Sequence, residues 1–251
     1  MSDPNLAQWT IELAPYEPFP HPGKVVLAVV LGDHPISVPA FHNMFRSFAE
    51  IDYYPMDLLD WVLDMAGVRS RYDAVLFYNF HLETPPGNEH SFFYQGLTAR
   101  VLEQIGQSRM GVVLLHHAIN AFPTWDYWAA LTGLPASERP FTLQELQTEH
   151  LFCERISVAV ADPTHPITQG LAPWDLVGET WGYGPYRLDP DCHTLLVTDH
   201  PAMRRKEIAW THQYGEARVF CLQPGHNNDA FGDPSFRTVL SRGILWAAGR
   251  L

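Results

Sequence analysis

The sequence has few cysteines, and they are widely spaced. Its 251 residues include three, Cys153, Cys192 and Cys221, and no two of them have CxxC spacing. An odd, scattered set of this kind predicts free thiols in a reducing compartment, and it argues against a disulfide framework or a thiolate zinc site. We therefore expect a cytoplasmic protein.

Basic residues and long apolar runs are also scarce. The 16 lysines and arginines face 28 acidic residues, and only Arg204, Arg205 and Lys206 form a basic cluster, whereas nucleic-acid-binding proteins present a basic face. No apolar run approaches the roughly 20 residues that cross a bilayer, and the proline-rich residues 1–23 lack a signal-peptide pattern. The sequence predicts neither a nucleic-acid partner nor a membrane span.

Several local motifs of cofactor binding and catalysis are missing as well. The chain contains no GxGxxG or GxxxxGK[ST] loop, no GxSxG elbow and no HExxH helix. Their absence argues against a nucleotide cofactor and against a serine nucleophile, and it means that any metal site must combine distant residues.

What the chain does contain is a series of short apolar runs. Residues 24–31 and 111–115 are rich in valine and leucine, which predicts strands buried on both faces, as in parallel sheets flanked by helices. A further strand is predicted at 72–78, and residues 207–213 and 218–222 form a predicted hairpin.

Together with intervening helical patterns, these strands predict one α/β domain. We expect a mostly parallel central sheet with helices on both faces. The domain is expected to span residues 24–251 after an N-terminal arm at 1–23, with irregular excursions near 135–153 and 171–192.

Histidines follow four of the predicted strands: His34, His81, the pair His116 and His117, and His226. Ligands of open α/β sheets bind at the carboxyl ends of the strands, so we expect several of these side chains to converge there. Imidazole is the usual acid or base near neutral pH and the commonest metal ligand. Any one of them alone is better explained as a hydrogen-bonded structural histidine, and it is the set as a whole that favours a site.

A metal ion is one use of such a set. His34, His116 and His226 would supply three nitrogen ligands and leave a fourth position open, as in catalytic zinc sites. Zinc or manganese is the divalent cofactor that we consider, and the sequence leaves open whether a metal is bound.

Outside the histidines, Glu179 stands in a tryptophan-flanked segment. Burial there would raise its pKa toward that of a useful base, and the alternative is a solvated loop carboxylate. Trp125, Trp181 and Trp210 could stack on a sugar ring, although tryptophans more often pack in the core or rim. Exposed aromatic faces would also favour a homo-oligomer.

An ordered set of motifs resembles the trehalose-utilisation (ThuA-like) family over residues 24–251. The set comprises Gly32-Asp33-His34-Pro35, Leu115-His116-His117-Ala118, the turn from Asp162 to Leu171, Glu179, Ala209-Trp210 and Gly225-His226. The resemblance implies a flavodoxin-like α/β fold related to class I glutamine amidotransferases. Here His116 and His117 occupy the elbow at which those enzymes carry a nucleophilic cysteine, so amidotransferase activity is not expected.

The resemblance also implies a role in sugar catabolism, often beside oxidoreductases that make 3-keto sugars. It predicts a small carbohydrate partner, such as a keto-glycoside. His116, His117, Glu179 and His226 are the predicted acid or base residues, while His34, His81, Trp125, Trp181 and Trp210 are predicted to contact the substrate. Lyase, hydrolase and isomerase reactions remain open. So do a noncatalytic sugar-binding or regulatory protein and a metal-dependent hydrolase of other small substrates.

Overall fold

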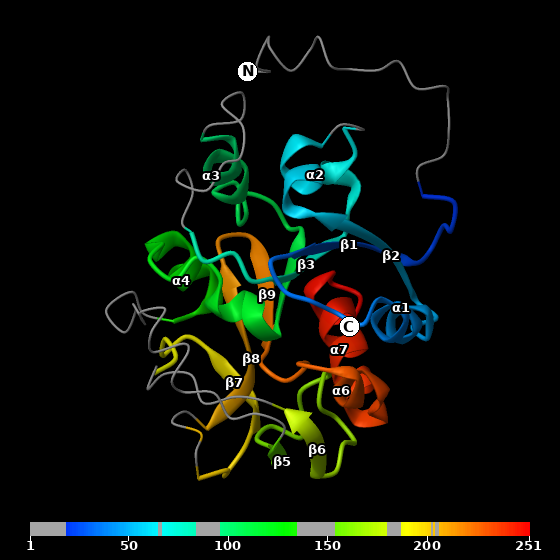
Figure 1. The fold of residues 1–251 in the computed structure, drawn as a ribbon, viewed down its shortest axis with the longest axis vertical. Helices are drawn as coiled ribbons and strands as arrows, with labels where there is room; N and C mark the ends of the chain where they lie inside the picture. The colour runs from blue at the N-terminus through cyan, green and yellow to red at the C-terminus, as the bar shows by residue number, and fades with distance from the viewer. Residues whose placement is uncertain are drawn as a thin grey trace.

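The computed structural model describes residues 19–64, 67–83, 96–134, 154–179, 187–201, 203 and 206–251, without the side chains of residues 154 and 179. Most of the predicted N-terminal arm and all of the excursion at 135–153 lie outside these ranges. The fold is built on one nine-stranded sheet with the order β2-β1-β3-β4-β9-β8-β7-β5-β6 (Figure 1). No helix in the described ranges is long and apolar enough to span a membrane.

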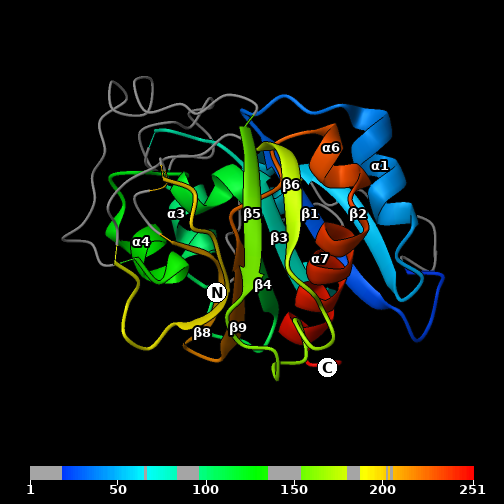
Figure 2. The same ribbon diagram turned by 90° about the horizontal axis from the view of Figure 1, so that it is seen from below.

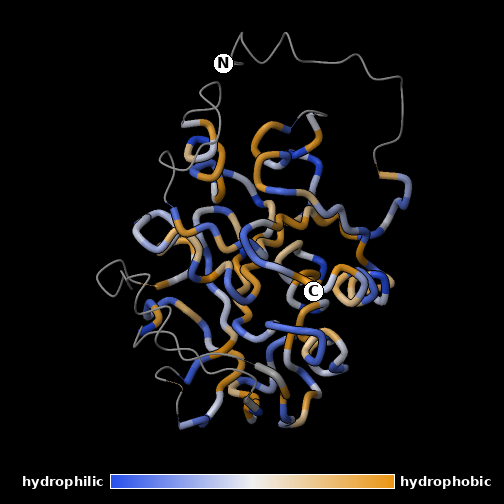
Figure 3. Tube along the Cα trace, in the orientation of Figure 1, coloured by the Kyte–Doolittle hydropathy of each residue, from blue (hydrophilic) through white to orange (hydrophobic). Residues whose placement is uncertain are grey.

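The first half of the sheet is parallel. It contains β2 (Ile51–Asp57), β1 (Val25–Gly32), β3 (Ala74–Asn79), β4 (Gly111–Leu115) and β9 (Ala217–Leu222). The succession β2-β1-β3-β4 followed by a fifth parallel strand is that of flavodoxin-like folds. Every residue of β3 and β4 is buried, and the hydrophobic colour in Figure 3 is concentrated along the central strands.

Helices cover both faces of this half, as predicted. One face carries α1 (Val38–Arg46), α6 (Asn228–Gly232) and α7 (Pro234–Ala247), and the other carries α2 (Leu58–Leu63), α3 (Leu97–Leu102) and α4 (Asp126–Thr132) (Figures 1 and 2). Short 3₁₀ helices follow α2 (η2, Arg69–Arg71) and β4 (η4, His116–Asn120). α1 forms because Phe41, Met44 and Phe45 recur at helical spacing and are all buried.

The second half is antiparallel, so the prediction of a mostly parallel sheet is wrong. It adds β8 (Glu207–Tyr214), β7 (His193–Val197), β5 (Glu154–Val160) and β6 (Trp174–Glu179). Of the eight pairings in the described sheet, four are parallel and four antiparallel. Only Gly215 and Glu216 separate β8 from β9. Two parallel neighbours need a long crossover connection, so strands joined by so short a turn must be antiparallel.

β5 and β6 form a ribbon at the end of the sheet. In the described ladder, β5 pairs with β7 at two positions, Ala159 with Val197 and Val160 with Leu196, whereas its pairing with β6 extends from Glu154 to Val158. β6 also packs against α6. Part of the excursion predicted at 171–192 is therefore a sheet strand.

Candidate functional site

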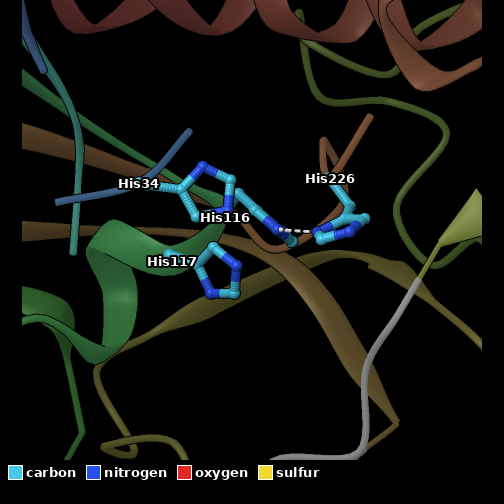
Figure 4. A group of neighbouring side chains, drawn as sticks. All are labelled: His34, His116, His117 and His226. Carbon is cyan, nitrogen blue, oxygen red and sulfur yellow. Dashed lines mark hydrogen bonds between the residues drawn. The ribbon is translucent and has the colours of Figure 1, made fainter. Parts of the chain in front are cut away.

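Four of the histidines lie together at the carboxyl edge of the parallel strands (Figure 4). His34 follows β1, His116 and His117 begin η4 directly after β4, and His226 follows β9. One ring nitrogen of each lies within 4.8 Å of one nitrogen of every other. Since the strand order reverses between β1 and β3, the cluster lies at the topological switch point, the position at which doubly wound folds bind ligands.

His116 stands on a sharp turn from strand to helix. Its φ is 56°, in the left-handed region that costs a non-glycine residue roughly 1–2 kcal/mol. Only 1% of the residue is exposed. A nucleophile elbow has the same plan, in which a strained turn presents a side chain at the top of the sheet; here it presents an imidazole.

The hydrogen bonds of His116 determine which ring nitrogen is available. Its Nδ1 lies 2.9 Å from the Gln223 carbonyl oxygen, and because a carbonyl can only accept, Nδ1 carries the hydrogen. The Nε2 atom therefore has the lone pair, and it lies 3.0 Å from Nδ1 of His226, the contact dashed in Figure 4. Backbone carbonyls orient metal-binding histidines in the same way.

Tyr78 contacts three parts of the cluster and was not among the site residues predicted from the sequence. Its hydroxyl donates to the Gly225 carbonyl at 2.8 Å, just before His226. Its ring is stacked against His116 at a 22° interplanar angle, and it meets His34 edge-on. The only signal in the sequence was its place at the end of a predicted strand.

Burial keeps two of the imidazoles neutral. It lowers the pKa of His34 to about 4, with a smaller contribution from nearby His226. It also holds the pKa of His116 well below its usual value, again with help from His226 and then His34. Nδ1 of His34 is buried and has no hydrogen-bond partner. Both side chains therefore present unprotonated imidazole at neutral pH.

His81 lies outside the cluster although it too follows a strand. Its Nε2 is 3.8 Å from the Asp33 carboxylate, and its Nδ1 is 3.0 Å from the side-chain amide of Asn79. The ring is stacked on Phe122. The structure thus places His81 beside Asp33 and Asn79, next to the cluster of four histidines and not within it.

The remaining predicted site residues have different surroundings. Trp125 is half-buried at the start of α4. Trp210 is fully buried and donates its indole N–H to the Thr132 carbonyl at 2.9 Å, which gives it a packing role. Glu179 ends β6, the strand that packs against α6, while its side chain and the whole of Trp181 lie outside the described part of the chain.

A family comparison bears on what this site is for. Residues 32–247 match the family model ThuA, described as trehalose utilisation. The chain belongs to the ThuA family. The matched region contains all four clustered histidines and both halves of the sheet, so family membership suggests a role related to trehalose utilisation. No protein of curated function matches the sequence significantly.

Solved structures of similar fold include a ThuA-like protein from Parabacteroides merdae, with 21% identity, a TM-score of 0.60 and coverage of 90% of each chain. Cytoplasmic protein STM3548 from Salmonella typhimurium has 10% identity and a TM-score of 0.58, over 88% of this chain and 98% of that one. PurLQS from Thermotoga maritima has 13% identity and a TM-score of 0.55, over 88% and 98%. At these identities the likeness shows a shared fold and nothing more.

Proposed function

We propose that this ThuA family member is a sugar-catabolic enzyme that acts on a keto-glycoside or related carbohydrate. The observation that supports the proposal is the convergence of four histidines at the carboxyl ends of the parallel strands: His34, His116, His117 and His226. A carbonyl group acidifies the hydrogen on the adjacent carbon, so a base and an electrophile near that carbonyl promote enolisation, isomerisation or elimination. The proposed partner is thus a small carbohydrate, handled in the cytoplasm.

We propose that the cluster also holds a divalent metal. The unpartnered Nδ1 of His34 fits this role, and so does Nε2 of His116, whose lone pair would exchange its hydrogen bond with His226 for the ion, because a metal ligand must be unprotonated. Nitrogens sharing one tetrahedral zinc ion lie about 3.4 Å apart, and those of the cluster lie within 4.8 Å of one another. An all-imidazole set suits zinc better than manganese, which prefers oxygen ligands. When bound, the ion would supply a Lewis acid for a substrate oxygen.

The protein's own groups would move the proton. With Nδ1 of His226 bonded to His116, Nε2 is the atom of His226 that can accept a proton from the substrate. Glu179 is the second candidate base, because β6 ends there and packs against α6, the helix that begins just after His226. His117, half of the pair at the elbow, would bind or orient the sugar beside the carbonyl.

The test is elemental analysis of untagged protein combined with turnover of 3-keto-glycosides before and after chelation. The proposal predicts near-stoichiometric zinc and turnover that falls on chelation and returns with zinc. Undiminished turnover in metal-free protein would overturn the metal assignment and leave His226 and Glu179 as acid and base. Binding of the sugar without product on prolonged incubation would overturn the enzymatic assignment in favour of a binding role.

Replacing Tyr78 with phenylalanine should weaken zinc binding about 10-fold, the lower end of the loss seen when groups behind metal ligands are changed. The variant keeps the ring that contacts His116 but loses the hydroxyl bond to Gly225 that positions His226. Competition with a fluorescent chelator measures the change. Tyr54→Phe is the matched control, since it also loses a hydroxyl hydrogen bond, to Asp52 on β2. Equal affinities in the two variants would contradict the positioning role.

A further inference from the structure

We propose that a cavity at the amino ends of the parallel strands, the ends opposite to the histidines, binds a small organic anion with an apolar body. The cavity has a volume of about 460 Å³, within the usual range for small-molecule sites. It lies between α2, η2 and α3, beside Tyr72 and Met110, which precede β3 and β4. Those two strands run from this cavity to the histidine edge.

The floor of the cavity is apolar. Trp61, Tyr72, Val101 and Ile105 line it and are each at least 90% buried. The indole N–H of Trp61 is buried and has no hydrogen-bond partner.

The rim carries more positive than negative charge. Two arginines, Arg69 and Arg109, and one acid, Asp64, line the cavity. The carboxylate of Asp64 already accepts hydrogen bonds from the backbone N–H groups of Val68 and Arg69. Arg69 is held in place, since its Nη1 donates to the carbonyls of Trp61 and Val62. Serine and glutamine side chains complete the rim: Ser70, Gln104, Gln107 and Ser108. This donor-rich rim belongs to a chain with a net charge of −12.

Together these features specify the class of ligand. Guanidinium groups favour carboxylate, sulfonate or phosphate oxygens, while the buried aromatic and aliphatic floor favours an apolar body. Inorganic phosphate would satisfy the rim but leave the floor uncovered, and a neutral hydrocarbon would do the reverse. The ligand that fits both is an amphipathic organic anion, which differs from the neutral sugar proposed for the histidine site.

The experiment uses 8-anilinonaphthalene-1-sulfonate as the anionic probe and N-phenyl-1-naphthylamine as its uncharged counterpart. Fluorescence titration of the full chain should show one saturable site for the anion. Arg109→Gln should weaken it at least 5-fold without changing the affinity for the uncharged probe, whereas Trp61→Phe, which makes the apolar floor smaller, should weaken the binding of both probes. Arg71→Gln is the control, because Arg71 packs over Phe19 and does not line the cavity.

The same titration can overturn the proposal. Equal losses in Arg109→Gln and Arg71→Gln would indicate a general effect of net charge, and unchanged affinity in both would remove the cavity as the binding site. Competition of the probe by zinc would place it at the histidines instead. Since no turnover is measured, these results are independent of the fate of the proposed enzymatic function.

Discussion

Replacing His116 with alanine should abolish stoichiometric zinc binding and lower kcat on a 3-keto-glycoside by at least about 100-fold, the smaller end of the range for acid-base residues. The substitution removes the Nε2 atom that faces His226 and leaves the Gln223 carbonyl without its donor. Elemental analysis and initial rates on the same preparation measure the two effects. If zinc content and kcat fall together, turnover depends on the histidine cluster.

The fold of the variant must be checked separately because His116 has a positive φ. His116→Asn is a second variant, since asparagine tolerates the left-handed region but cannot reproduce the position of Nε2. His42→Ala on α1 is the control, because this exposed histidine lies outside the cluster and is hydrogen-bonded to the Tyr53 hydroxyl. Full zinc content and normal kcat in both His116 variants would refute the assigned role.

Replacing Gly243 with alanine should lower the free energy of unfolding by about 2–3 kcal/mol, in the range for overpacked cores. A Cβ at this position of α7 would stand 2.1 Å from Cε1 of Phe220 on β9. Phe220 is fully buried, so its ring must shift within the core or the helix must move away from the sheet. Urea unfolding measures the change.

Gly232→Ala supplies the matched control in α6. A Cβ there meets nothing within 4 Å, so stability should change by less than about 0.5 kcal/mol, as for ordinary surface substitutions. If Gly243→Ala were as stable as this control, the close approach of α7 to β9 would be incorrect.

The parallel half of the fold could be predicted because its signals are local. The apolar runs that form β1, β3 and β4 are each buried on both faces, so their composition identifies them without knowledge of their partners. β6 was missed because apolar and polar residues do not alternate regularly along it. Trp174 and Leu176 are at least partly buried, but the next residue, Val177, is also apolar although it is 45% exposed. Which strands pair, and in which direction, depends on long-range packing that no local pattern records.

The site was predictable in outline for a similar reason. Histidines after β1, β4 and β9 must meet once those strands lie parallel. The sequence could not separate His81 from them, because its contacts with Asp33 and Asn79 depend on the shapes of two loops. Nor could it show the tautomer of His116, which depends on a carbonyl 107 positions away in the chain.

The junction between β5 and β7 has a mechanical consequence for the proposed base. Two ladder pairs, at Ala159 and Val160, join the β5–β6 ribbon to the sheet, while the ribbon itself is paired along most of its length. The position of the ribbon therefore depends on this short junction and on the packing of β6 against α6. Because Glu179 ends β6, the placement of the proposed base depends on that packing, whereas the clustered histidines directly follow strands of the parallel half.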